Sequence, residues 1–351
     1  MKKLLFAIAL FAASACAFGA DKTMAELNPE FEGRMKAALT ENSLALFHFT
    51  DVHSDKVEFA RYCEFYKTYE RYFDDAVCTG DLVEESWVND FDYWGNTPGH
   101  EKILIALGNH DALLDHENWK ASYNVWDVNL ATMGETYNKF FAPFIKDWGV
   151  IYEQGKTYWY KDYPKNKVRL IALDCMLRPR RNAEDEAAQL RWFKECLMGA
   201  RAKNYTVVVA FHFPLWKSEA LDGCIFNWKN KPDSAWYECF DAYQEAVDKF
   251  KKKGGSFACW FGGHTHWDYT NVNPEYPDQI SLCVTALTRF KCGCMRRTNG
   301  AKSQDIANAL IIDHDSHTFK VVRIGCDIDT EGVVRRTMTV DYKTSKVLEQ
   351  E

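Results

Sequence analysis

The segment SFACWFGGHTH, residues 256–266, is an apolar run that ends in two glycines and two histidines. The run has the length of a buried strand, and its polar residues all lie at its carboxyl end. His264 and His266 are two positions apart, so in an extended segment their side chains point the same way. Gly262 and Gly263 allow the backbone to turn beside them without a Cβ clash. The segment therefore predicts a strand that brings two imidazoles to one edge of a sheet.

Four earlier segments have the same form, an apolar run that ends in polar residues. They are LALFHFTDVH at 44–53, DDAVCTGDLV at 74–83, KILIALGNHD at 102–111 and TVVVAFHFP at 206–214. Longer segments with helical patterns lie between them, at residues 55–73, 184–201 and 234–255. Alternating strands and helices are typical of α/β proteins, which bind ligands at the carboxyl ends of their strands. We therefore expect an α/β fold with one polar sheet edge.

The polar residues at these five strand ends are the ligand types of a transition-metal site. They are Asp51, His53, Asp81, Asn109, His212, His264 and His266. Each one alone is more typical of surface or capping positions, but one sheet edge would bring all of them together. Mixed carboxylate and imidazole ligands favour Mn, Fe or Zn over Ca and Mg, which prefer oxygen ligands.

The ordered motifs DVH, GD, GNHD, FHFP and GHTH, from Asp51 to His266, resemble the signature of the calcineurin-like metallophosphoesterases. The resemblance covers most of the chain and implies a four-layer α-β-β-α sandwich with mixed β-sheets. It also implies two divalent metal ions, with Mn, Fe or Zn expected. By this resemblance, the first ion would be bound by Asp51, His53 and His266, the second by Asn109, His212 and His264, and both by the bridging Asp81.

The family resemblance further implies a hydrolase in which a hydroxide that bridges the two ions attacks phosphorus. Two ions lower the pKa of a shared water towards about 7 and neutralise charge on the phosphoryl group. His110 would act as general acid on the leaving oxygen. Glu84 stands where relatives often carry an aspartate that pairs with this histidine, and an exposed loop glutamate is the alternative interpretation.

The expected substrate is a small-molecule phosphomonoester or phosphodiester. Arg178 and Arg289 are candidate phosphate contacts, with solvated loop arginines as the alternative. The aromatic-rich residues 119–148 are a candidate cap over a base or sugar, and helix packing is the alternative. A non-catalytic metal-binding scaffold or sensor on the same fold is the competing function. The presence of a leaving-group acid, His110, favours the enzyme.

The first 20 residues have the pattern of a signal peptide. Lys2 and Lys3 precede an apolar run that is too short to span a membrane, and small residues suited to cleavage follow it. We expect export to the periplasm or the exterior, with lipid attachment through Cys16 as the alternative. No later stretch is apolar for long enough to form a transmembrane segment.

The rest of the chain is expected to form a single metallophosphoesterase domain at residues 21–326. Within it, residues 112–165 are a candidate cap insertion, because they separate neighbouring strands by more than an ordinary connection requires. Residues 327–351 are expected to form a C-terminal strand or tail. The sequence carries no signal for an oligomeric state.

The net charge and the number of cysteines bear on nucleic acid binding and on disulfide formation. The formal charge is −7, and loss of Lys2 and Lys3 with the signal peptide makes it −9, which argues against binding of nucleic acid backbones. Without Cys16 the chain has eleven cysteines, an odd number, and several lie in apolar runs. We expect Cys78, Cys259 and Cys283 to be small buried residues. The pair in KCGC at 291–294 is either a metal or disulfide site or an ordinary loop.

Overall fold

The structure is a computed structural model, and it describes most of the chain. The described residues are 22–84, 92–112, 130–177, 183–213, 235–264, 269–272, 280–283, 298, 300–328, 334 and 336–351. The predictions for the signal peptide, Arg178, His266, Arg289 and the KCGC cysteines lie outside these residues, as do those for the aromatic residues at 119–126.

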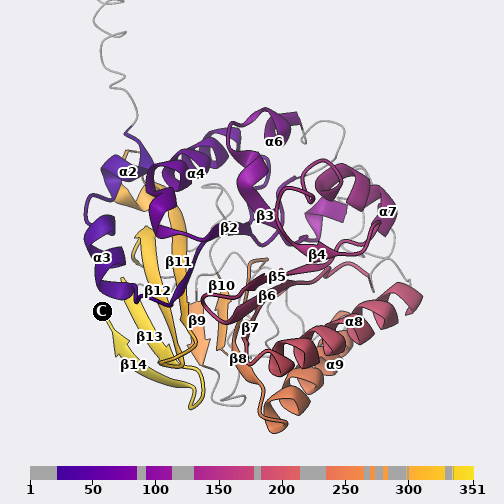
Figure 1. Ribbon diagram of the computed structural model, residues 1–351. Coiled ribbons are helices and arrows are strands. Elements are labelled where there is room, and N and C mark those ends of the chain that lie inside the picture. The colour runs from indigo at the N-terminus through magenta and orange to yellow at the C-terminus, as the bar shows by residue number, and fades with distance from the viewer. Residues whose placement is uncertain are drawn as a thin grey trace, which may run out of the picture.

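The described strands form two sheets of seven strands each. The first sheet contains β1 (Leu44–Phe49), β2 (Asp75–Cys78), β3 (Ile103–Ile105), β11 (Ile306–Asp313), β12 (Thr318–Gly325), β13 (Thr337–Asp341) and β14 (Lys346–Gln350). The second contains β4 (Ile151–Tyr152), β5 (Trp159–Tyr163), β6 (Val168–Ala172), β7 (Thr206–Ala210), β8 (Ser256–Gly262), β9 (Tyr269–Val272) and β10 (Ile280–Cys283). Their orders are β14-β13-β12-β11-β1-β2-β3 and β4-β5-β6-β7-β8-β10-β9, and Figure 1 shows them lying face to face.

Both sheets are mixed. In the first sheet β1, β2 and β3 run parallel, and β11 pairs with β1 in the antiparallel direction. In the second sheet β6, β7, β8 and β10 run parallel, and β5 and β9 are antiparallel to their neighbours. The parallel strands of each sheet therefore all end at one edge, as the sequence pattern predicts.

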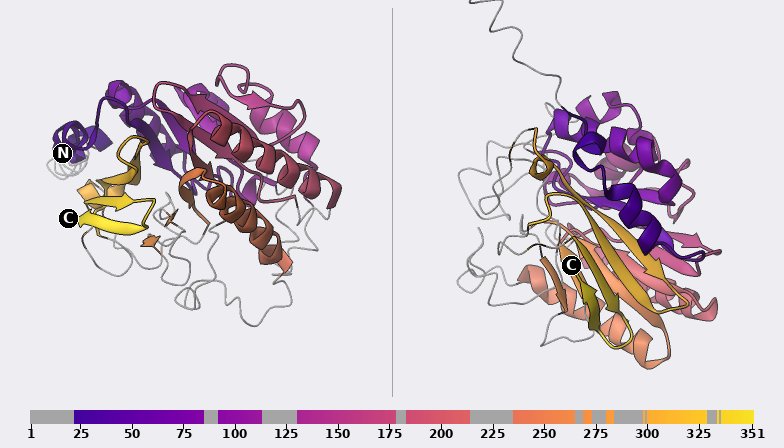
Figure 2. Two further views of the ribbon diagram at one scale, coloured as in Figure 1. Left: turned by 60° about the horizontal axis from the view of Figure 1, so that its bottom comes forward. Right: turned by 90° about the vertical axis from the view of Figure 1, so that its left-hand side faces the viewer.

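The longer helices cover the outer faces of the two sheets (Figure 2). They are α4 (Lys56–Tyr69) on the first sheet and α8 (Ala183–Ala202) and α9 (Ala235–Lys252) on the second. Phe47 and Phe49 of β1 contact the ring of Tyr62 in α4, with ring centroids 5.9 and 5.2 Å apart. On the other side, Phe193 of α8 lies 5.9 Å from Trp260 of β8. The predicted α-β-β-α sandwich is confirmed.

Shorter helical turns complete the described structure. They are α2 (Met24–Leu27), α3 (Phe31–Ala38), α6 (Asp92–Asn96), α7 (Met133–Thr136), η1 (Glu70–Tyr72), η2 (His100–Lys102), η3 (His110–Ala112), η5 (Tyr137–Phe141) and η9 (Lys302–Gln304). Among the described residues, no helix combines the length and the apolar character needed to cross a membrane.

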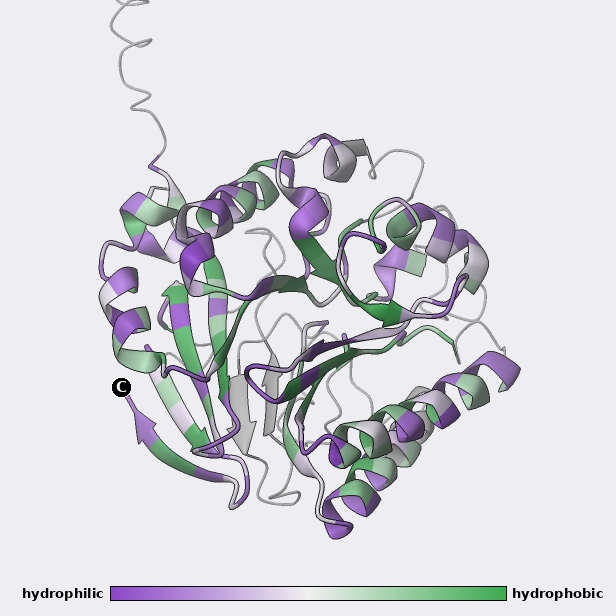
Figure 3. Cartoon of the chain, viewed as in Figure 1, coloured by the Kyte–Doolittle hydropathy of each residue, from purple (hydrophilic) through white to green (hydrophobic). Residues whose placement is uncertain are grey.

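The main core lies between the two sheets, where the strands are largely hydrophobic (Figure 3). Leu46 and Leu310 of the first sheet share one buried cluster with Val208 and Cys259 of the second. Cys78 and Cys259 are buried and free, as predicted for both. The two sheets are therefore joined largely by apolar packing, and the candidate ligands lie where the strands end.

The described part of residues 112–165 packs into this core. Phe140, Phe141 and Trp148 belong to the main buried cluster, and the indole of Trp148 donates to the carbonyl of Glu101 at 3.1 Å. The strands β4 and β5 then join the second sheet. The position of Trp148 therefore fits the alternative interpretation of the aromatic residues, that they pack in the core. Beyond the expected domain end, β13 and β14 extend the first sheet.

Candidate metal centre

Six of the seven predicted ligands lie in the described residues, and the structure brings all six together. Each follows a parallel strand: Asp51 and His53 follow β1, Asp81 follows β2, Asn109 follows β3, His212 follows β7, and His264 follows β8. His53 Nε2 lies 3.6 Å from Asp51 Oδ1 and 3.8 Å from Asp81 Oδ2. His212 Nε2 lies 3.2 Å from Asp81 Oδ2 and 3.1 Å from Asn109 Oδ1. The sixth, His264, places Nδ1 2.8 Å from the same Asn109 oxygen.

These side chains divide into two donor groups that share one carboxylate. Asp51, His53 and Asp81 form one group and Asp81, His212 and His264 the other, with the ligand atoms of each group within 4.8 Å of one another. Two ligand atoms bound at about 2.1 Å to one ion lie about 3.0 to 3.4 Å apart in octahedral or tetrahedral geometry. The observed separations are close to this spacing, so the donors fit two ions that share Asp81.

The backbone at the site is left-handed at several residues with side chains. The φ angles are 54° at Asp51, 47° at His53, 53° at Asp81 and 73° at His264. Such angles cost an L-residue about 1 to 3 kcal/mol, and Asp and His tolerate them better than most. Two main-chain hydrogen bonds of 2.9 Å offset this cost, from Asp51 N to the carbonyl of Gly80 and from His53 N to the carbonyl of Asp81.

Two glycines are required by the close approach of the carboxylates. A Cβ atom at Gly108 would clash with Asp81 Oδ1, and one at Gly263 would clash with Asp51 Oδ2. In each case the carboxylate packs directly against the main chain of a strand end from another part of the sequence. The glycines of the GNHD and GGHTH motifs therefore make room for the ligands.

Asp111 organises the loop that carries Asp81, a role that sequence reasoning missed. Its buried carboxylate accepts four main-chain hydrogen bonds, from Asp81, Leu82, Val83 and Gly108, at 3.0, 2.8, 3.3 and 2.8 Å. Burial and the charge of Asp81 raise the pKa of Asp111 to about 7, although the N–H donors favour its ionised form. Its place in GNHD, directly after Asn109 and His110, is the one sequence signal from which the role could have been found.

The charges at the centre of the site stabilise one another. Burial opposes ionisation of Asp81, but the neighbouring charges of His212 and His110 outweigh it and hold the pKa of Asp81 below its usual value. Burial likewise opposes protonation of His212, yet the carboxylate of Asp81 raises its pKa to about 9. The centre therefore favours an ionised carboxylate and attracts positive charge.

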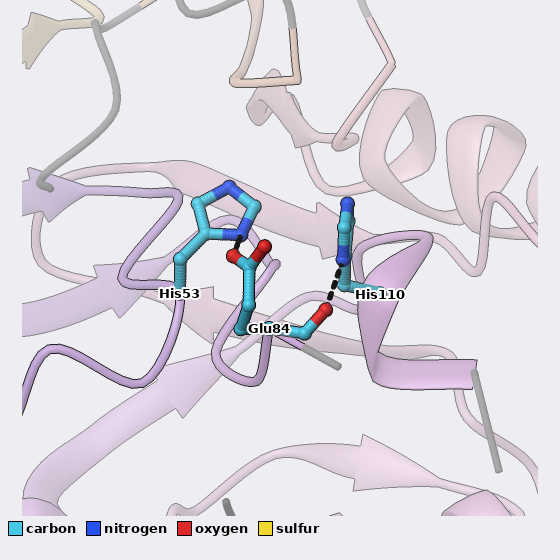
Figure 4. Close-up of side chains that lie close together, drawn as sticks. All are labelled: His53, Glu84 and His110. Carbon is cyan, nitrogen blue, oxygen red and sulfur yellow. Dashed lines mark hydrogen bonds and ion pairs between the residues drawn. The ribbon is translucent and has the colours of Figure 1, made fainter. Parts of the chain in front are cut away.

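His110 and Glu84 contact each other in a way that differs from the prediction (Figure 4). His110 Nδ1 lies 2.6 Å from the main-chain oxygen of Glu84, and the Glu84 carboxylate lies 2.7 Å from Nδ1 of His53. The predicted pair of the Glu84 carboxylate with His110 is therefore corrected. The glutamate side chain extends past His110 because its own main chain already occupies the position next to that ring. Its side chain is 17% exposed, so it is not the exposed loop residue of the alternative interpretation.

Comparisons with known proteins agree with this fold. The family model of the calcineurin-like phosphoesterases matches residues 44–268, more than half of the chain. A dimetal phosphatase from Danio rerio superposes with a TM-score of 0.51 at 11% identity, over 85% of this chain and 99% of that one. This likeness shows the fold alone.

Two other solved structures are more distant. GAP50, the anchor in the inner membrane complex of Plasmodium, has a TM-score of 0.42 at 12% identity, over 89% of this chain and 88% of that one. The phosphopantetheinyl hydrolase of Mycobacterium tuberculosis has a TM-score of 0.35 at 12% identity, over 70% and 91%. No curated protein matches the sequence. On the family match over residues 44–268, this chain belongs to the calcineurin-like phosphoesterase family.

Proposed function

We propose that the protein is an exported phosphoesterase that requires two divalent ions and hydrolyses a small-molecule phosphomonoester or phosphodiester. The observation that carries the proposal is the position of Asp81, whose carboxylate belongs to both donor groups and lies 4.0 Å from Nε2 of His110. A shared carboxylate next to a proton donor is the arrangement that a hydrolytic dinuclear centre requires.

The assignment of ligands follows the two donor groups. Asp51, His53 and His266 would hold one ion, and Asn109, His212 and His264 the other, with Asp81 between them. Imidazole, carboxylate and amide ligands suit Mn, Fe or Zn. Two such ions supply Lewis acidity that activates water and offsets the negative charge of a phosphoryl group.

The hydrogen bond to Glu84 determines which nitrogen of His110 works as the acid. A main-chain carbonyl only accepts, so His110 Nδ1 must carry a proton to make its 2.6 Å contact. The proton that is gained and lost is therefore the one on Nε2, which faces Asp81. His110 would donate this proton to the leaving oxygen of the ester.

The variant His110→Ala tests this role. We expect it to keep both ions and to slow hydrolysis of esters with poor leaving groups by about 100-fold, because general acids contribute about 10²- to 10⁴-fold. Nitrophenyl esters, whose leaving groups need no proton, should be affected far less. Steady-state rates on the two kinds of ester measure the difference, and an equal loss on both would remove His110 from the acid role.

The main experiment combines metal analysis with a phosphoester panel. The purified chain is loaded with Mn, Fe or Zn, its metal content is measured by elemental analysis, and chromogenic mono- and diesters are supplied. We expect two ions per chain, hydrolysis of at least one ester, and loss of activity on chelation. If two ions bind and no ester is cut, the function is that of the metal-binding scaffold or sensor.

The proposed export is supported by residues 1–20, with their paired lysines and apolar run. Expression of the full chain in a bacterial host, followed by fractionation and N-terminal sequencing, tests it. We expect processed protein outside the cytoplasm. Processing at Cys16 with lipid attached would instead establish the anchored form.

A further inference from the structure

Glu84 contacts two histidines of the site through two different groups (Figure 4). Its carboxylate lies 2.7 Å from His53 Nδ1, and its main-chain oxygen lies 2.6 Å from His110 Nδ1. The two rings are close, with centroids 4.8 Å apart, and nearly perpendicular at 86°. Both contacts use Nδ1, so both histidines keep Nε2 for the centre of the site.

The contact with the carboxylate selects one tautomer of His53. Two lone pairs 2.7 Å apart would repel each other, so the proton is placed on Nδ1 of His53, towards the Glu84 carboxylate, and the lone pair on Nε2. That lone pair lies on the nitrogen 3.6 Å from Asp51 Oδ1 and 3.8 Å from Asp81 Oδ2. A carboxylate behind a ligand imidazole also makes the imidazole a stronger base towards a metal ion.

The loop structure holds Glu84 in place for this contact. Its main-chain N–H donates to Ser54 Oγ at 3.0 Å, and the N–H of Ser54 donates to the carbonyl of Leu82 at 2.9 Å. The side chain of His53 is only 1% exposed, so solvent does not compete for its Nδ1. The pair is therefore formed by two segments that are hydrogen-bonded to each other next to the site.

We propose that Glu84 is a positioning residue for His53, and that its carboxylate strengthens binding of the ion held by Asp51, His53 and Asp81 over the ion on the opposite side. The proposal rests on the proposed dinuclear function. Loss of such an outer partner typically weakens metal binding by about 10- to 100-fold. The two contacts that carry this inference are with His53 and His110, and neither histidine belongs to the second donor group, so the second ion should be bound with little change.

The test compares Glu84→Ala, Glu84→Gln and Glu84→Asp with the unaltered full chain. Each metal-free protein is titrated with Mn²⁺ alone, and affinity and stoichiometry are followed by calorimetry. We expect Glu84→Ala to weaken one of the two ions by about 10- to 100-fold and to leave the other unchanged. Glu84→Gln keeps the length of the side chain but not its charge, and Glu84→Asp keeps the charge but is too short. We expect the Mn²⁺ affinity to fall less in Glu84→Gln than in Glu84→Asp.

A matched control is Glu101→Gln, since Glu101 also faces a histidine, His100, at 3.5 Å, but on a turn away from the site. It should leave both Mn²⁺ affinities unchanged. Side-chain ¹⁵N NMR of the metal-free proteins gives a second readout, with His53 assigned by His53→Gln. The Nδ1–H form of His53 should dominate in the unaltered chain and lose its dominance in Glu84→Ala.

The outcomes distinguish a failure of the role proposed for Glu84 from a failure of the proposed dinuclear function. Equal weakening of both ions, or no weakening of either with an unchanged His53 tautomer, would overturn the role of Glu84. Loss of one whole ion in Glu84→Gln would make Glu84 a direct ligand and would also overturn it. Binding of fewer than two ions by the unaltered chain would instead refute the dinuclear function, while the NMR result would still report on the Glu84 contact.

Discussion

The two sheets contribute unequally to the metal centre. The first sheet supplies Asp51, His53, Asp81 and Asn109, including both carboxylates among the described ligands. Its loops are hydrogen-bonded to one another through their main chains, and the Asp111 carboxylate fastens two of them. The second sheet supplies only imidazoles in its described part, from His212 and His264.

The second half of the centre is oriented by the first. His212 Nδ1 donates to the carbonyl of Thr79 at 2.7 Å, and the main-chain N–H of His264 donates to both Asp51 oxygens at 3.1 Å. The first sheet therefore provides the carboxylates and a template, that is, the hydrogen-bonding groups that orient the second half. The second sheet provides the two imidazoles that are oriented by them. Loss of the shared Asp81 or of Asp111, which fastens the loops of the first half, should affect both ions, whereas loss of a donor in the second half should affect one.

The largest expected effect is that of Asp81→Asn in the first half. Loss of the shared charge leaves two cations facing each other without a bridging carboxylate, so we expect binding of paired ions and hydrolysis to be lost together. Elemental analysis and ester hydrolysis measure both. Asp315→Asn, an exposed aspartate far along the chain with a 53% exposed side chain, is the control and should match the unaltered protein.

His212→Ala tests the second half and should have a narrower effect on metal content. The group of Asp51, His53 and Asp81 stays complete, so we expect one ion to be retained and hydrolysis to be lost for want of the other. The number of ions per chain decides the comparison. Loss of both ions would show that Asp51, His53 and Asp81 do not bind an ion without the second group.

Asp111→Ala tests the template rather than the ligands. It removes the acceptor of four main-chain N–H groups, and each buried donor left unpaired costs about 1 to 3 kcal/mol. With partial rescue by water, we expect the free energy of unfolding to fall by about 3 kcal/mol and both ions to bind more weakly. Urea denaturation of the metal-free protein separates the loss of stability from the loss of ligands, and unchanged unfolding would contradict the template role.

The narrowest effect, on the pH dependence of stability alone, concerns His48, which lies where the two sheets meet. It is buried, its Nε2 lies 2.9 Å from Thr79 Oγ1, and its ring contacts Phe261 of the second sheet at 4.8 Å. Burial lowers its pKa from 6.5 to about 3. Between these values the unfolded chain binds one more proton than the folded chain, so this histidine makes stability fall as the pH falls.

Its contribution is about 1.4 kcal/mol per pH unit over that window. We therefore expect His48→Gln to lose stability less steeply than the unaltered chain as the pH falls from about 6.5 towards 3. Unfolding free energies from urea titrations at several pH values measure the slope. His100→Gln removes a histidine elsewhere, and a slope change equal to that of His48→Gln would contradict the assignment.

The meeting of the candidate ligands was predictable because each lies at a strand end and has its signal within a few residues of sequence. Parallel strands bring such ends together whatever their distance along the chain. The α/β class followed from the alternation of strands and helices, whereas the sandwich was implied by the resemblance of the ordered motifs to the family. All seven ligand assignments stay predictions, and the position of His266 lies outside the described residues.

The partners of Glu84 and Asp111 were not predictable in the same way. Whether the Glu84 carboxylate meets His53 or His110 depends on where its main chain lies in space. Asp111 accepts from main-chain groups about 30 residues earlier, and such donors have no sequence signature. The aromatic residues before β4 left two interpretations open, because the same helical spacing suits a core face and a cap.

The bare main chain at Gly108 and Gly263 has a consequence for how this family member can evolve. Every single-base change in a glycine codon that alters the amino acid introduces a side chain, and any side chain at these two places collides with a ligand carboxylate. No substitution at either position is only mildly harmful, so we expect selection to keep glycine at both. Variation that keeps these carboxylates in place must therefore lie at other positions of the chain.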